Sequence, residues 1–148
     1  MRYLVRQRFW SWLGDAFDIT GGGGRLLYRV RRDGKRIAFC APSGDEAAAL
    51  LEVAHNRWVL SVGGVDRATA AFVRPPWRGR FEIQVPVGVV EIEHRGRRFE
   101  IAMDGARAAT VRRRFFFWTD AFRVEVASPV EPLFALGLAV VIALVDRS

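Results

Sequence analysis

The sequence predicts a mainly β protein, a closed antiparallel β-barrel that surrounds an apolar helix from its own C-terminal part. Three observations predict it. Apolar and polar residues alternate over short runs, turn-forming residues separate these runs at short intervals, and one uncharged apolar segment near the end breaks the alternation. Runs of period two indicate strands with one face on a core, and many short strands are typical of a sandwich or a barrel. At 148 residues the chain has the length of one domain, which we expect to span residues 1–148.

The strands are predicted from four alternating runs. In each, every second residue is apolar, and the runs are Trp58-Leu60-Val62, Phe81-Ile83-Val85, Phe99-Ile101-Met103 and Phe122-Val124-Val126. Glycine- and proline-containing turns punctuate the chain at Gly21 to Gly24, Asp33-Gly34, Ser43-Gly44, Gly63-Gly64, Pro75-Pro76, Arg95-Gly96 and Asp104-Gly105. The four glycines lack the Lys-Ser/Thr that follows in a phosphate-binding loop, so they are interpreted as a turn.

The helix is predicted from Leu133 to Val145, thirteen residues without a charge. A helix of this length spans about 20 Å, whereas a bilayer core needs about 30 Å, so we expect no integral membrane protein. Because the run is apolar on every face, it is predicted to be buried inside the barrel, over about residues 130–146. A fully buried strand is the alternative. The expected core positions are Leu133, Leu136, Gly137, Val140, Val141 and Leu144.

Gly137 lies in the middle of this segment, where glycine costs about 1 kcal/mol relative to alanine. We expect a bulky side chain of the barrel wall to press against it.

A hairpin unit recurs in the chain. Val5 to Trp10 followed by Asp15 to Ile19 returns as Val111 to Phe116 followed by Asp120 to Val124, and a weaker copy spans Val73 to Ile83. Each copy is predicted to be a strand, an aromatic tip and a returning strand. Repeated hairpins build a barrel wall, because closure leaves no free strand edge.

Three segments carry a resemblance to a known family. They read VRQRFWSWLGDAFDI at 5–19, VRRRFFFWTDAFRV at 111–124 and EPLFALGLAVVIALV at 131–145. In this order they resemble the LURP-one-related family, which is grouped with the tubby C-terminal domain and the phospholipid scramblases. The resemblance covers Met1 to Val145. It implies a tubby-like barrel of about 12 strands around a hydrophobic helix, in a family without an established enzymatic activity. We expect no enzyme and no cofactor.

The resemblance also has limits. Tubby domains bind phosphoinositides through basic residues, but their lipid-binding motif is not matched closely, so no residue is carried over. Scramblases have further segments ahead of the barrel and a calcium site, neither of which is found here. Gly21 to Gly24 replaces the polar turn of the family.

The charge is strongly positive. The formal net charge is +7, and Lys35 is the only lysine among 23 basic residues. Arginine forks match phosphate and carboxylate groups, so the charge suits an anionic membrane, nucleic acid or an acidic protein. The single cysteine, Cys40, excludes an internal disulfide, and the arginines near Met1 exclude a secretory signal. We expect a cytoplasmic protein, peripheral to the membrane at most.

Residue types that support catalysis or metal binding are present but scattered. His55 and His94 have no histidine or cysteine at ligand spacing, so no metal site is expected. Cys40 follows Phe39 in an apolar run and is predicted to be a buried, inert thiol. Glu91 and Glu93 alternate with Val90 and Ile92, which indicates a solvated outer face rather than an acid-base pair. A hydrolase would need one histidine gathered with a carboxylate.

Arginines in short clusters are the candidate site. Several adjoin aromatic residues, and the residues assigned to anion or lipid binding are Arg6, Arg8, Arg97, Arg98, Arg112, Arg113 and Arg114. Since neighbours on a strand point to opposite faces, at most half of each cluster shares one side. The first hypothesis is peripheral binding of anionic phospholipid or phosphoinositide. The alternative is a scaffold that binds protein or nucleic acid, the latter without any known nucleic-acid-binding motif.

Overall fold

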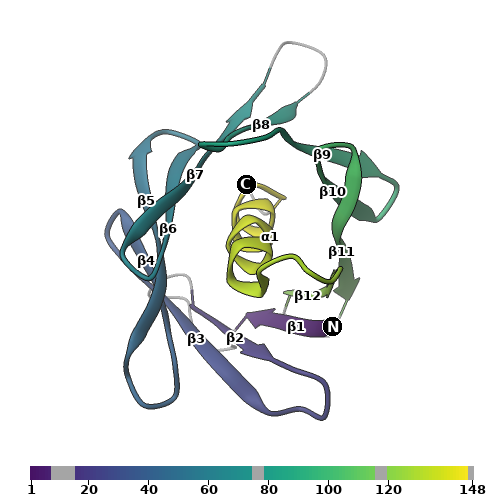
Figure 1. Ribbon diagram of the computed structural model, residues 1–148. Helices are drawn as coiled ribbons and strands as arrows, with labels where there is room; N and C mark the ends of the chain where they lie inside the picture. The colour runs from purple at the N-terminus through teal and green to yellow at the C-terminus, as the bar shows by residue number, and fades with distance from the viewer. Residues whose placement is uncertain (8–15, 75–78, 116–119, 147–148) are drawn as a thin grey trace.

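Twelve antiparallel strands close into one barrel within the described part of the chain. The structure, a computed structural model, describes residues 1–7, 16–74, 79–115 and 120–146. The elements are β1 (Arg2–Gln7), β2 (Ala16–Thr20), β3 (Leu26–Asp33), β4 (Arg36–Cys40), β5 (Glu46–Ala54), β6 (Arg57–Val62), β7 (Val65–Val73), β8 (Arg80–Gln84), β9 (Val90–Arg95), β10 (Arg98–Met103), β11 (Ala106–Phe115), β12 (Asp120–Val126) and α1 (Pro132–Asp146). Figure 1 shows the strands as a ring around the helix. The predicted fold class is confirmed.

The ring closes between the first and the last strand. Sequential strands pair as hairpin neighbours, and β1 then pairs with both β2 and β12. The N-terminal ammonium of Met1 donates to the carbonyl of Val126 at 3.0 Å, and the Val126 N–H donates back to Met1 at 2.9 Å. Pairing the two ends of the sheet leaves no exposed edge at this point.

The alternating runs place their apolar residues on the inner face, as predicted. Trp58, Leu60 and Val62 are buried, and so are Phe122, Val124 and Val126. Among the residues that the structure describes, no polar or charged side chain is buried. The interior is therefore mainly apolar, although it includes the buried Nε1 atom of Trp58, and burial of apolar surface is the dominant stabilising contribution to such a fold.

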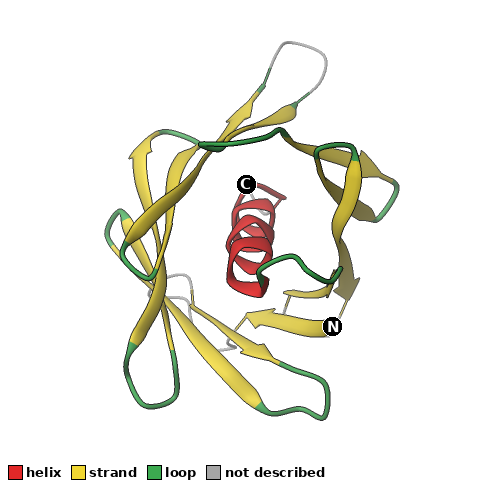
Figure 2. Ribbon diagram, in the orientation of Figure 1, coloured by secondary structure: helices red, strands yellow, loops and turns green. Residues whose placement is uncertain are grey.

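α1 fills the centre of the barrel (Figure 2). It begins at Pro132 and ends at Asp146, close to the expected span. Leu136, Val140 and Val141 have no exposed surface. Leu133 and Leu144, near the two ends of the helix, are partly buried and pack against the same core. No helix in the described ranges is long and apolar enough to cross a membrane.

Gly137 lies where the helix comes closest to the wall. A Cβ atom built on it would lie 2.6 and 2.8 Å from the two terminal methyl groups of Leu60, which belongs to β6 and is fully buried. Carbon atoms prefer separations of about 3.5 Å or more, so a side chain at position 137 would have to displace the methyl groups of Leu60. This is the bulky wall residue that the sequence predicted.

One seam of the wall is weak. β8 and β9 share a single register pair, Ile83 with Val90, whereas the other neighbouring strands pair over four or more positions. Phe81 and Ile83 of β8 are consequently only partly buried. Towards the end of β9, the ring of His94 stacks on Phe99 at 4.3 Å, and Phe81 approaches Phe99 edge-on at 6.2 Å. The contact between Phe81 of β8 and Phe99 of β10 therefore reaches over the seam where the backbone ladder is missing.

Candidate anion-binding surface

Four arginines lie directly opposite one another on β9, β10, β11 and β12. The register pairs Arg95 with Arg98, Arg98 with Arg112 and Arg112 with Arg123. We call these four residues the arginine row. Neighbouring strands lie about 4.8 Å apart, so the row spans about 14 Å across the wall.

The arginine row faces outward. Phe99, Val111 and Val124, next to row members along the strands, are buried in the core, and side chains alternate between faces. Arg95 and Arg98 leave 56% and 44% of their side chains exposed. Arg112 is exposed and Arg123 is half-exposed. Four cations therefore lie on one outer face of the wall.

A second outward row, two positions further along each strand, carries carboxylates. It contains Glu93, Glu100, Thr110 and Glu125, again directly opposite one another. Arg95 pairs with Glu93 at 3.1 Å and approaches Glu100 at 3.8 Å, while Arg98 approaches Glu100 at 3.5 Å. Hydrogen bonding to Glu93, reinforced by the charges of Glu93 and Glu100, raises the pKa of Arg95 above its ordinary value.

The two halves of the arginine row therefore differ. Arg95 and Arg98 have carboxylate partners, but Arg112 and Arg123 have no ion pair with any side chain that the structure describes. Glu125, the nearest acidic position on β12, approaches Arg2 of β1 at 3.4 Å. Arg112 and Arg123 keep their donors available, and like charges directly opposite on a sheet are unfavourable unless an anion bridges them.

The outer face gains further arginines next to this pair. Arg114 is exposed two positions beyond Arg112, and the register places it opposite Ala121, which in turn lies opposite Arg6. Arg112, Arg114, Arg123 and Arg6 therefore belong to one outer patch on β11, β12 and β1. We call these four residues the arginine patch.

The remaining predicted arginines lie elsewhere. Arg113 lies opposite the fully buried Phe122 and so points to the inner side, as alternation requires. Arg97 lies in the β9–β10 turn, where its carbonyl accepts a hydrogen bond from the Arg113 N–H at 3.2 Å. Arg8, and the aromatic tips with Phe9, Trp10, Trp77 and Trp118, lie outside the described residues.

Arg123 is the member that sequence reasoning missed. Its outward direction follows from the alternation with Phe122 and Val124, but its place beside Arg112 depends on the register of the β11–β12 hairpin. The hairpin repeat carried a partial signal, because it marks 111–116 and 120–124 as partners.

The other candidate residues are exposed or half-buried. His55 is exposed in the β5–β6 turn, and Glu91 and Glu93 are exposed as predicted. No cluster of three metal-ligating residues occurs in the described part of the chain. The prediction of a buried thiol at Cys40 is wrong, since this residue is half-buried. Phe39 takes the inner position, so alternation turns Cys40 to the outer face.

Comparison with known proteins decides the family. The LURP-one-related family model matches residues 1–143, nearly the whole chain. The chain belongs to the LURP-one-related family. An X-ray structure of an Arabidopsis thaliana protein is similar to it, with a TM-score of 0.73 and 19% sequence identity, over 99% of this chain and 91% of the other. At this identity the likeness concerns the LURP-one-related fold alone. No curated protein matches the chain.

Proposed function

We propose that the protein is a non-catalytic binding module that docks on anionic phospholipid headgroups, phosphoinositides included, through the arginine patch. The alignment of Arg112 with Arg123 supports this most directly, because it places two unpaired cations side by side on the outer wall. Arginine forks bind phosphate with two parallel hydrogen bonds. The net charge of +7 attracts the protein to an anionic cytoplasmic leaflet.

The size of the effect follows from the number of cations. A basic residue near an anionic surface contributes about 1 kcal/mol, so Arg112, Arg114 and Arg123 supply roughly 3 kcal/mol, without counting Arg6, which lies opposite Asp18 of β2. Each 1.4 kcal/mol is about a tenfold change in affinity. These three residues therefore raise affinity for an anionic vesicle by roughly two orders of magnitude over a neutral one.

Charge reversal at Arg112 tests the proposal. Arg112→Glu removes one attraction and adds one repulsion, so vesicle affinity should fall about tenfold or more. The matched control is Arg31→Glu, which changes the net charge equally at an exposed position of β3 whose strand neighbours are Ala16 and Ala38. Co-sedimentation with phosphatidylserine vesicles measures both. Equal losses in the two variants would show that only net charge matters, and would overturn the assignment of the site.

Thermal stability provides a second readout. Like charges directly opposite on strands destabilise a sheet by about 0.2–1 kcal/mol, so Arg112→Glu should keep or raise the melting temperature while binding is lost. A fall in both the melting temperature and the vesicle affinity would indicate a structural role for Arg112. Retention on DNA that Arg112→Glu abolishes, without vesicle binding by the wild type, would favour the nucleic-acid alternative.

A further inference from the structure

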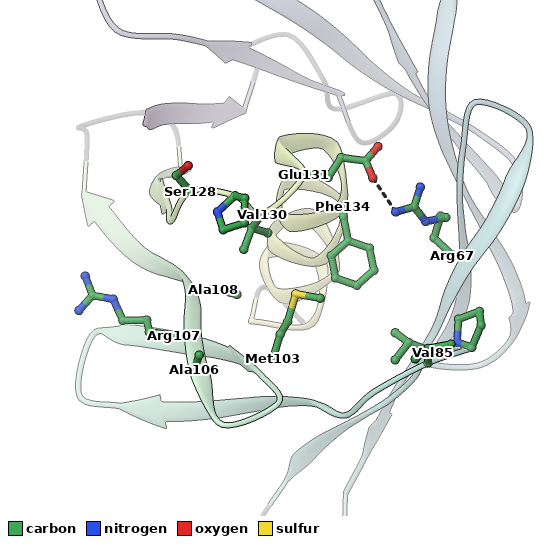
Figure 3. A pocket seen from close by; sticks show the side chains of 13 residues that line it. Arg67, Val85, Met103, Ala106, Arg107, Ala108, Ser128, Val130, Glu131 and Phe134 are labelled. Carbon is green, nitrogen blue, oxygen red and sulfur yellow. Dashed lines mark ion pairs between the residues drawn. The ribbon is translucent and has the colours of Figure 1, made fainter.

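A cavity of about 650 Å³ opens at the end of the barrel where α1 begins. Figure 3 shows it between the first turn of the helix, the β10–β11 turn and the segment that joins β8 to β9. Its volume is in the range of about 300–1,000 Å³ that is typical of small-molecule sites. It lies at the weak seam of the wall, next to the single pair between Ile83 and Val90.

The wall of the cavity is held in place by Asp104. One carboxylate oxygen of Asp104 accepts the N–H of Val89 at 2.8 Å, and the Asp104 N–H donates to the Val89 carbonyl at 2.8 Å. Gly88 is required beside it, since its φ is +94° and a Cβ there would lie 2.8 Å from the same carboxylate. Val89, at the end of the segment that joins β8 to β9, is thereby fixed to the β10–β11 turn.

The floor of the cavity is apolar. The side chains of Phe134 of α1 and Met103 of β10 point towards each other, and Val85 lies on the side of the cavity opposite Met103 (Figure 3). Val130 and the buried Ala108 complete the lining. At the rim Val87 leaves 89% of its surface exposed, so its side chain is accessible to an apolar ligand.

The rim carries the charge. Arg67 pairs with Glu131 at 2.6 Å, and the exposed Arg107 directs its guanidinium away from Phe134 and Met103 (Figure 3). Two arginines against one carboxylate leave the rim positive by one charge. An apolar floor below a positive rim matches a hydrocarbon chain with an acidic head.

We propose that this cavity binds a single-chain anionic amphiphile, with the hydrocarbon chain against Phe134 and Met103 and the acidic head at Arg107. The site is separate from the arginine patch. Ala108 is four residues from Arg112 along β11, about 13 Å, and the cavity opens at the barrel end while Arg112 lies on the outer wall. The inference therefore does not depend on the proposed membrane docking.

Displacement of a fluorescent polyene fatty acid, cis-parinaric acid, tests the site. Dodecanoate should compete saturably with the wild type. Ala106→Trp should abolish competition, because Ala106 lines the cavity yet is exposed, so a large side chain fills the space without entering the core. The matched control is Ala54→Trp, at an exposed alanine of β5 outside the cavity lining, which should bind as the wild type does. Melting curves check that both variants are folded.

The head group is tested with Arg107→Gln and with dodecanol. Loss of an exposed charge contact should weaken dodecanoate binding about threefold and leave dodecanol unchanged. Arg112→Glu should change the binding of neither dodecanoate nor dodecanol. Comparing dodecanoate with lysophosphatidic acid distinguishes a free fatty acid from a membrane-derived lysolipid, and tighter binding of either supports the proposal. Equal binding by Ala106→Trp and the wild type, or dodecanol as tight as dodecanoate, would overturn it.

Discussion

Replacing Gly137 with alanine tests the contact between the central helix and the barrel wall. In an exposed helix this change would stabilise the protein by about 1 kcal/mol. Here the added methyl group would lie 2.6 and 2.8 Å from the terminal carbons of Leu60, which is fully buried. Overpacking of this kind costs about 1–3 kcal/mol, and two contacts this short place it near the upper value.

The net expectation for Gly137→Ala is a loss of about 2 kcal/mol. For a domain of this size that lowers the melting temperature by about 4–8 °C. Equilibrium unfolding in urea measures the free energy of unfolding directly, provided that its dependence on urea concentration is the same in the variant and the wild type.

A double-mutant cycle with Leu60→Ala isolates the contact. Alone, Leu60→Ala leaves a cavity and should cost about 2–5 kcal/mol. In the double variant the alanine at position 137 meets no leucine methyl groups. The stability lost in the double variant should therefore be smaller than the sum of the two single losses, by at least about 1 kcal/mol. A stabilising Gly137→Ala variant, additive with Leu60→Ala, would refute the close approach of helix and wall.

Three further predictions concern the core, the cavity wall and the charge. Val141→Asp should yield no folded protein, because an unpaired charge in this hydrocarbon core costs several kcal/mol, whereas Val87→Asp at a position 89% exposed should fold; circular dichroism melting separates the two. Asp104→Ala removes the acceptor of the Val89 N–H and should cost about 1–2 kcal/mol in urea unfolding, together with weaker dodecanoate binding. Affinity for phosphatidylserine vesicles should be the same at about pH 6 and about pH 9, since arginine stays protonated throughout; a fall towards pH 9 in co-sedimentation would assign the charge to another group.

The barrel and its helix could be predicted because their signals are local. Period-two alternation assigns each residue of a strand to a face without knowledge of its neighbours. Likewise the uncharged run from Leu133 to Val145 admits no exposed face. The burial of Leu136, Val140 and Val141 follows from this run alone.

The candidate site was predicted only in part because it depends on register. Alternation already separates Arg113 from Arg112 and Arg114. Arg123 lies beside Arg112 because of the register in which β11 pairs with β12. The sequence of either strand alone does not determine this register. β-bulges add to the difficulty. The register shifts between Ile101 and Ala102, so counting residues back from one hairpin misplaces the next.

The cavity had no local signal. The run Phe81-Ile83-Val85 alternates in the same way as runs that pair along their full length, yet β8 meets β9 at one position. Pro86 and Gly88 mark a turn, but the opening beside it arises from how two hairpins diverge in space. Its rim also combines residues from β7, β11 and the segment ahead of α1, far apart in the chain.

Flotation of the purified, detergent-free protein with vesicles tests the central claim most directly. Neutral and phosphatidylserine-containing vesicles are compared at about 50 mM and about 500 mM salt, because screening weakens exposed charges within a Debye length. Flotation with anionic vesicles alone, lost at high salt, is the result that a peripheral barrel with an arginine patch predicts. Protein that remains at the bottom of the gradient with anionic vesicles at low salt would contradict membrane docking through the patch.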